Sequence, residues 1–229
     1  MGRGLALRWA LMHEIWLGSR HIEKAGAVSR ECESIARGFY GSRMKGTIRG
    51  TVGTDIPPLV EVVVLTLPPQ HALETVRQIK GKLTPQHVVI STIVPMTRQG
   101  KLFTYSPVVV AGKTAYEKSA AELVADEIGS IPVVSAFQTV PATYLADLDS
   151  ILNIDVLLSG NDEHALQTAA KIVQDIPNLR ALRVGPLSDS KFVESITPLL
   201  LNAAILNKLK DPSIRIVPWF PSDFAEEQS

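Results

Sequence analysis

The chain has 229 residues, and its 23 basic and 23 acidic side chains leave a formal net charge of zero. A hydrophobic content of 45% excludes a disordered chain, and the length suffices for a full core without metal or disulfide support. The single cysteine, Cys32, excludes a disulfide scaffold and any cysteine-rich metal site, and it favours a cytoplasmic location.

Helices and strands are expected to alternate along most of the chain. Apolar residues at helical spacing predict helices over 2–11, 21–40, 70–82, 116–128, 162–175 and 189–210, with a short helix after Pro141. Apolar runs predict strands over 14–18, 46–50, 60–67, 87–93, 132–137, 155–159 and 179–184, and 95–114 is expected to be a long loop. This order is typical of an α/β protein with a doubly wound, mostly parallel sheet.

The last predicted helix differs from the others. After Glu194 it is apolar nearly all round, which is typical of a buried helix and here suggests a subunit interface. Pro198 is expected to kink it. We place a loose boundary near residue 150, so that 151–217 forms a smaller, mostly helical subdomain and 218–229 a flexible tail.

Several classes of protein are excluded by spacing. No apolar run reaches the ~18 residues of a membrane span, and no Walker loop or G-x-S-x-G motif is present. His13 and Glu14 lack the second histidine of a zinc protease, and Asp162 to His164 are expected to cap a helix, so no metal site is predicted. No basic stripe interleaved with aromatic residues points to nucleic acid. Residues 1–50 carry a net charge of +5, which favours a local anion site.

Four segments together carry a family resemblance. They are Gly2-Arg3-Gly4, Gly18-Ser19-Arg20 with Lys24, Thr66-Leu67-Pro68, and the stretch 185–202 (GPLSDSKFVESITPLLLN). This combination resembles the NADPH-dependent reductases that pass hydride to the deazaflavin coenzyme F-420, and the resemblance runs from Gly2 to about Val217. It implies a Rossmann-type fold, an oxidoreductase activity with NADP(H) and coenzyme F-420, and a homodimer through the C-terminal helix. Residues 1–150 would then form the NADP-binding domain.

The residues after the second strand of the family pattern indicate which nicotinamide coenzyme is used. An acidic residue there would bind the ribose 2′-hydroxyl of NAD, whereas this chain has Ser19, Arg20 and Lys24, which suit a 2′-phosphate. The alternative is that Ser19 caps a helix and the two basic side chains are solvated. The remaining cofactor-binding residues implied by position and resemblance are Gly2, Thr66, Leu67, Pro68 and Pro95.

The resemblance also implies a pocket for the second substrate. One wall would contain Gln138, Val140, Pro141 and Ala142, and another would contain Leu187, Ser188 and Asn202. For Asn202 the alternative is a buried amide that holds the last helix. Direct transfer of hydride between two stacked rings needs no protein nucleophile, so no catalytic side chain is predicted.

The chain departs from the family pattern at its front. The family opens with a strand and a G-x-G-x-x-G turn, whereas this chain starts at the last glycine, Gly2, so the first strand and most of the loop are absent from it. That strand would lie in the middle of the sheet. The activity of such a chain is left open, and two other functions stay possible: a ferric-chelate or imine reductase on the same fold, and a noncatalytic nucleotide-binding remnant.

Overall fold

The computed structural model describes residues 1–107, 109–110, 113–114 and 118–217, so the predicted tail lies outside the described residues. The helices are α1 (Gly2–Trp9), α2 (Ile22–Tyr40), α3 (Pro69–Ile79), α4 (Ala120–Ile128), α5 (Ala142–Ala146), α6 (Glu163–Gln174) and α7 (Ser190–Asn207), with the short 3-10 turn η5 (Leu187–Asp189) before the last. The strands are β1 (Glu14–Ser19), β2 (Thr47–Val52), β3 (Val62–Leu65), β4 (Val88–Ser91), β5 (Met96–Gln99), β6 (Leu102–Tyr105), β7 (Val109–Val110), β8 (Lys113–Thr114), β9 (Val133–Ser135), β10 (Ile154–Gly160) and β11 (Leu179–Gly185). Apart from the segment around β5 to β8, the predicted elements are found within a few residues of their expected places.

The central sheet has five strands in the order β11-β10-β9-β4-β3. Neighbours run parallel except for β9 and β10, which are antiparallel. The expectation of a doubly wound, mostly parallel sheet is therefore confirmed. Strands on both sides of residue 150 belong to this one sheet, and the boundary placed there stays a prediction.

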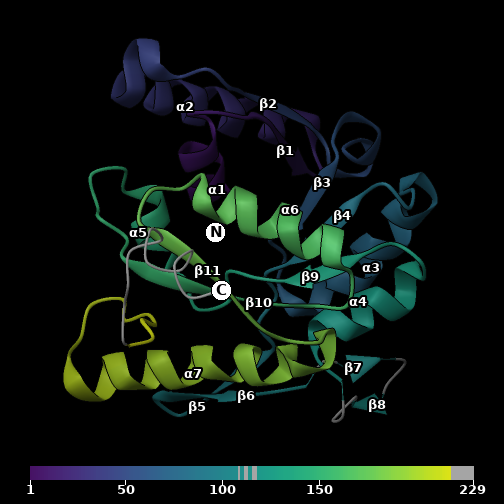
Figure 1. Cartoon of the computed structure of the whole chain (residues 1–229), viewed down its shortest axis with the longest axis vertical. Coiled ribbons are helices and arrows are strands. Elements are labelled where there is room, and N and C mark those ends of the chain that lie inside the picture. Colours follow the sequence, from purple (N-terminus) through teal and green to yellow (C-terminus); the bar gives the residue numbers. More distant parts are fainter. Residues whose placement is uncertain (108, 111–112, 115–117, 218–229) are drawn as a thin grey trace, which may run out of the picture.

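The strands β1 and β2 form a separate parallel pair. Within the described residues no ladder joins β1 to β3, so the parallel strands are divided into a two-stranded and a five-stranded part. Figure 1 shows the two-stranded part with α2 at one end of the molecule and the five-stranded sheet in its middle.

Three groups of buried apolar residues hold these layers together. One lies between the five-stranded sheet and the helices α1 and α6, and it includes Leu5, Trp9, Leu158 and Val173. A second, on the other face of the sheet, includes Val76 of α3 and Val124 of α4. The third lies between α1, α2 and β2, and it consists of Ala6, Leu7, Ala10, Cys32, Ala36, Tyr40, Met44 and Ile48. The two-stranded part thus has a core of its own.

The predicted long loop is wrong for its first half, because β5 and β6 form an antiparallel hairpin. Gln99 pairs with Leu102 across a two-residue turn, where Gly100 adopts a φ of +62° that glycine accepts without strain. The hairpin lies along α7 (Figure 1). The next helix begins later than predicted, at Ala120, because Ser119 and Glu122 form a capping box in front of it.

Within one chain the last helix is only partly covered, and its burial in a subunit interface stays a prediction. Only Ser190, Val193, Glu194 and Pro198 of α7 are buried. Phe192, Leu199 and Leu206 stand at intervals of seven residues and are 61%, 65% and 68% exposed. α7 is one helix to Asn207 with Pro198 inside it. None of the helices in the described ranges has the length and hydropathy needed to cross a membrane.

Candidate functional site

The N-terminus of α1 lies against the end of β3. A Cβ atom added at Gly2 would lie 2.8 Å from Oγ1 of Thr66, and one added at Gly4 would lie 2.5 Å from Cβ of Leu145. Gly4 therefore requires glycine, because the added atom would also meet backbone atoms of Leu145 and Ala146, whereas at Gly2 only the hydroxyl of Thr66 would have to turn. The first amide groups of a helix have no intrahelical acceptor, so this terminus presents N–H donors and a positive partial charge beside Thr66.

The basic residues of the predicted 2′-phosphate site lie where β1 passes into α2. Ser19 ends β1, and its Oγ is 3.4 Å from the backbone nitrogen of His21. Arg20 and Lys24 are exposed. Within the described part of the chain, neither basic side chain has a carboxylate partner. Both are free to bind an anion that meets the end of β1.

The ends of β3 and β4 are fastened to each other. Thr92 donates to the carbonyl of Leu65 through both its backbone nitrogen, at 3.3 Å, and its Oγ1, at 3.1 Å. Thr66 and Leu67 follow β3 and are half-buried, and Pro68 is exposed directly before α3. Pro95, beyond the end of β4, is buried. The structure thus brings Gly2 and Thr66 into contact and places Leu67 and Pro68 next along the same strand end.

Gln138 belongs to the predicted pocket wall that also contains Val140, Pro141 and Ala142, and it is buried. Its Nε2 donates to the carbonyl of Ser91 at 2.9 Å and to Oγ of Ser135 at 2.7 Å. The backbone carbonyl of Gln138 accepts a hydrogen bond from Oγ1 of Thr197 on α7 at 2.8 Å. The side-chain oxygen of Gln138 is buried with no hydrogen-bond partner among the described residues. This oxygen can therefore accept a hydrogen bond from a donor outside the described residues.

Two more polar atoms at the same place are also without partners. The register pairs Ser91 with Ser135 and Ser135 with Ser159, so three serines stand side by side across β4, β9 and β10. Oγ of Ser91 and Oγ of Ser159 are buried and unpartnered within the described ranges. A concentration of buried, unsatisfied polar atoms is unusual in a core, and it makes this part of the sheet a candidate binding site.

The turn between β9 and Gln138 is strained. Phe137 is 1% exposed and has a φ of +69°, a conformation that costs a non-glycine residue of order 1 kcal/mol or more. Its ring meets that of Trp9 edge-on, with the ring centroids 5.7 Å apart. Packing against α1 therefore holds the turn, and the turn sets the direction in which Gln138 leaves the sheet.

The other predicted wall residues are distributed between core and surface. Val140 and Leu187 are buried, Pro141 is half-buried, and Ala142 and Ser188 are exposed. The backbone nitrogen of Leu187 donates to Oδ1 of Asn161 at 2.9 Å. Thr197 joins the two walls through its bond to Gln138, a contact that the sequence analysis did not foresee.

Asn202 lies apart from these residues. Its Nδ2 donates to the carbonyl of Phe103 at 2.8 Å, and its Oδ1 accepts from the backbone nitrogen of Phe103 at 2.7 Å. The amide thus binds the hairpin as a neighbouring strand would. Asn202 is also twelve residues beyond Ser190, or about 18 Å along the helix axis. Within one chain Asn202 therefore does not share a pocket wall with Leu187. Its contacts fit the alternative stated above, in which its amide holds the last helix in place.

Three buried charged residues were missed by the sequence analysis: Asp155, which pairs with Arg180 and Arg215, and the residues Arg8 and Glu194. Arg8 of α1 donates to the backbone carbonyls of Tyr144, Leu145, Asp147 and Ser150 around the end of α5. Glu194 of α7 accepts bonds from the start of α4 and from β6. A charged residue inside an apolar run was the only sequence signal for Arg8 and for Glu194.

The described residues include no cluster of three or more histidine, cysteine or acidic side chains that could hold a metal ion. His13 pairs instead with Asp175 at 2.8 Å. Asp162 caps α6 by accepting from the backbone nitrogen of Ala165, as the sequence predicted.

Comparison with known proteins assigns the chain to a family. It is 35% identical over 219 residues to the F420-dependent NADP reductase of Methanocaldococcus jannaschii, covering 94% of this chain and 92% of that protein. The protein of the same name from Methanothermobacter thermautotrophicus is 32% identical over 221 residues, covering 94% and 89%. A solved structure from Arthrobacter sp. FB24, described as a candidate F420-dependent NADP reductase, superposes with a TM-score of 0.73 at 16% identity over 95% of this chain and 96% of that one. No family model matches the chain.

Proposed function

The chain belongs to the F420-dependent NADP reductases, and on that premise we propose how its residues serve the transfer of hydride between NADP(H) and coenzyme F-420. The observation that carries the function is the 35% identity over nearly the whole of a protein with that activity in its name. The relatives are not named for ferric-chelate or imine reduction, and neither alternative is favoured. The location that best suits a chain with one buried thiol is the cytoplasm.

NADP(H) would lie across the ends of β1 and β3. The N-terminus of α1 at Gly2 would bind the diphosphate, and the exposed side chains of Arg20 and Lys24 would bind the 2′-phosphate. Thr66, Leu67, Pro68 and Pro95 would border the nicotinamide half. The residues fit this coenzyme, because an accessible helix terminus and two basic side chains without carboxylate partners are what its phosphates require.

Coenzyme F-420 would lie against the strained turn after β9. Val140, Pro141, Ala142 and Leu187 would supply its apolar wall, and Ser188 would border it. The unpartnered side-chain oxygen of Gln138 is an acceptor for an N–H or O–H at the polar edge of the ring system. Asn202 would act on this pocket through the hairpin that it holds.

The two coenzymes, when bound, supply the chemistry themselves, because hydride passes directly from one ring to the other. The work of the chain is to bind both rings in contact and to keep water out. Thr197 and Gln138 couple the two walls of the pocket, and the packing of Phe137 on Trp9 fixes their geometry. None of these groups accepts or donates the hydride.

A second copy of the chain would cover the exposed side of α7. Phe192, Leu199 and Leu206 form one apolar row along this helix, and a row of that spacing packs well against its own copy. The homodimer expected from the sequence is therefore retained as a proposal.

The function is tested by following NADPH oxidation with coenzyme F-420 as acceptor. We expect F-420 to be reduced at least about tenfold faster than riboflavin or a ferric chelate at equal concentration. Equal rates with all three acceptors would contradict the proposed pocket. NADPH binding without turnover in any acceptor would support the noncatalytic alternative.

The coenzyme preference is tested with Arg20→Ala and Lys24→Ala combined. Each charged contact to phosphate is worth about 1.5–3 kcal/mol, so loss of both should raise the Kd for NADPH by roughly 100-fold or more and leave that for NADH within about twofold. Fluorescence titration measures both constants. Arg30→Ala, which removes an exposed arginine of the same helix, is the control. Equal weakening of NADPH and NADH would show that these residues do not read the 2′-phosphate.

A further inference from the structure

Glu194 is a carboxylate that the hydride transfer does not use, and the fold buries it completely. Its Oε1 accepts from the backbone nitrogen of Ala121 at 3.1 Å. Its Oε2 accepts from the backbone nitrogen of Ala120 at 3.0 Å and from the hydroxyl of Tyr105 at 3.2 Å. The carboxylate therefore meets the two first amides of α4 and one hydroxyl of β6 at the same time.

These bonds fasten three elements that are distant in the sequence. Glu194 belongs to the first turns of α7, Ala120 and Ala121 begin α4, and Tyr105 ends the hairpin. α4 packs directly on the five-stranded sheet, so it serves as the fixed partner. The first turns of α7 have no other charge-assisted bond to α4 among the described residues.

The same turns of α7 lie between two parts of the proposed second pocket. Leu187 and Ser188 precede Glu194 in η5, and Thr197 follows it by three residues and binds the carbonyl of Gln138. A shift of this part of α7 would therefore move both Leu187 and the residue that joins the two walls. The position of the wall depends on what holds α7 to α4.

We propose that Glu194 is a positioning residue for the second substrate, because its three hydrogen bonds fix the wall formed by η5 and the start of α7. The inference rests on the proposed function, since it concerns the pocket assigned there to coenzyme F-420. The phosphates of the nicotinamide coenzyme would bind at the ends of β1 and β3, which none of these three bonds involves. Loss of the carboxylate should therefore affect the two substrates unequally.

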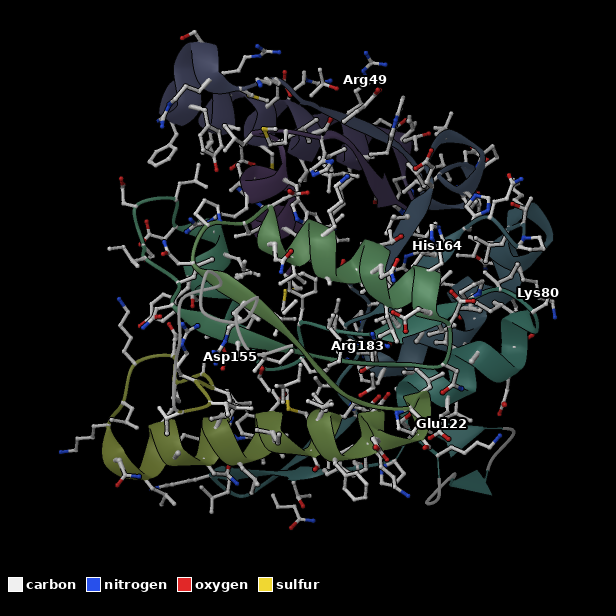
Figure 2. The ribbon with its side chains drawn as sticks, in the orientation of Figure 1. Arg49, Lys80, Glu122, Asp155, His164 and Arg183 are labelled. Atoms are coloured by element: carbon white, nitrogen blue, oxygen red, sulfur yellow. The ribbon has the colours of Figure 1, made fainter. Side chains whose placement is uncertain are left out.

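A carboxylate suits this place and a carboxamide does not. The site supplies three donors, and an ionised carboxylate accepts from all of them. The glutamine of Glu194→Gln has one acceptor oxygen and turns an NH2 group toward a backbone N–H or a hydroxyl, so at least one bond is lost. The other titratable groups that face Glu194 are Tyr105 from β6 and Glu122 from α4. Figure 2 labels Glu122 beside the N-terminal end of α7.

The test compares Glu194→Gln with Glu122→Gln. Glu122 lies at the same helix end, but glutamine can replace glutamate in a capping box, so its variant changes a nearby carboxylate and keeps the local bonds. At pH 8, where the carboxyl of Glu194 is ionised, we expect Glu194→Gln to raise the KM for coenzyme F-420 about tenfold, with kcat and the KM for NADPH within about twofold of the original. Glu122→Gln should leave all three within twofold.

Amide hydrogen exchange of the chain without coenzymes supplies a second readout. In Glu194→Gln the amides of Ala120, Ala121 and the segment 187–197 should exchange at least about tenfold faster, while those of β4 stay unchanged. Tyr105→Phe removes one donor and keeps the carboxylate, and it should give the same changes at a smaller size. If Glu194→Gln does not fold, Tyr105→Phe takes its place in the exchange measurement.

The outcomes separate this inference from the proposed function. If the original chain reduces F-420 but the KM values of both substrates rise together, or neither rises, Glu194 does not position the second pocket. If the original chain does not reduce F-420, the proposed function fails, and the exchange measurement still decides whether Glu194 fixes η5 and α7. Unchanged exchange in both Glu194→Gln and Tyr105→Phe would overturn the inference by itself.

Discussion

Arg8 and Glu194 are charged residues that the fold buries, and the backbone provides most of their partners. The sequence analysis gave neither residue a role, because the backbone groups that accept from Arg8 or donate to Glu194 come from elements more than 70 residues away. Ser19, Arg20 and Lys24 could be found from the sequence, since their meaning depends on a local position after a strand. Residues whose role needs a distant partner could not.

Arg8 allows a prediction about stability. Arg8→Met keeps much of the side-chain volume but removes the donor of four backbone carbonyl groups in one buried and three part-buried bonds, so the free energy of unfolding should fall by about 2–4 kcal/mol. Arg3→Met on the same helix removes an ion pair with Glu31 in which both side chains are about half exposed, and it should cost about 0–1 kcal/mol. Urea unfolding measures both. Equal effects of the two variants would mean that the bonds of Arg8 add nothing to folding.

Glu194 allows a prediction about pH. Burial raises the pKa of this carboxyl from 4.5 to about 7, although its three hydrogen-bond donors act in the opposite direction. Between these pH values the folded chain holds a proton that the unfolded chain has released, so the free energy of unfolding falls as pH rises from about 4.5 to 7. The contribution of this group is full below that range and is lost above it, and its size is at most about 3 kcal/mol.

Urea unfolding at pH 5 and pH 8 checks this dependence. The free energy of unfolding at pH 5 minus that at pH 8 should be smaller in Glu194→Gln than in the original chain, because glutamine does not titrate. Other groups titrate in both proteins and cancel in this comparison. The same difference in both proteins would show that Glu194 is not protonated near neutral pH in the folded chain.

At the scale of elements, the helices and the parallel strands could be predicted because their patterns are local and periodic. The hairpin of β5 and β6 was missed, although Gly100 stands at the turn between two short stretches, because those strands pair with no strand of the main sheet. The side chain of Asn202 and packing on α7 hold the hairpin in place. The antiparallel pairing of β9 and β10 was likewise not foreseen, since nothing in either strand distinguishes the two directions.

The exposed apolar row on α7 can be tested as a dimer interface. Leu199→Glu places a charge in the middle of the row formed with Phe192 and Leu206, and it should convert a dimer into a monomer in sedimentation equilibrium. Ile35→Glu on α2, where the original side chain is 40% exposed, is the control and should leave the mass unchanged. A dimer that survives Leu199→Glu would have to use another surface, and a monomeric original chain would end the proposal.

At the scale of the whole molecule, the main feature is the division of the parallel strands between β1 and β3. The helix α1 packs against both parts and joins them, since Leu5 and Trp9 belong to the core of the large sheet and Ala6, Leu7 and Ala10 to that of the small one. The two parts are therefore connected by a helix and by no strand ladder.

This division predicts unequal stability. Amides of β1 and β2 should exchange with solvent at least about 100-fold faster than those of β4, β9 and β10, because the smaller part can open without breaking the five-stranded ladder. Saturating NADPH, which would contact both parts, should slow exchange in β1 and β2 more than in the larger sheet. Exchange of all these strands at one common free energy would show that the chain opens only as a whole.

The single thiol of the chain can report when the two-stranded part opens. Cys32 is completely buried in the core between α1, α2 and β2, and burial raises its pKa, so a disulfide reagent can reach it only when that core opens. The rate at which such a reagent labels the unmodified chain therefore measures the opening of the two-stranded part alone. No engineered probe is needed, and labelling in rising concentrations of NADPH would read coenzyme binding from a residue that the coenzyme does not touch.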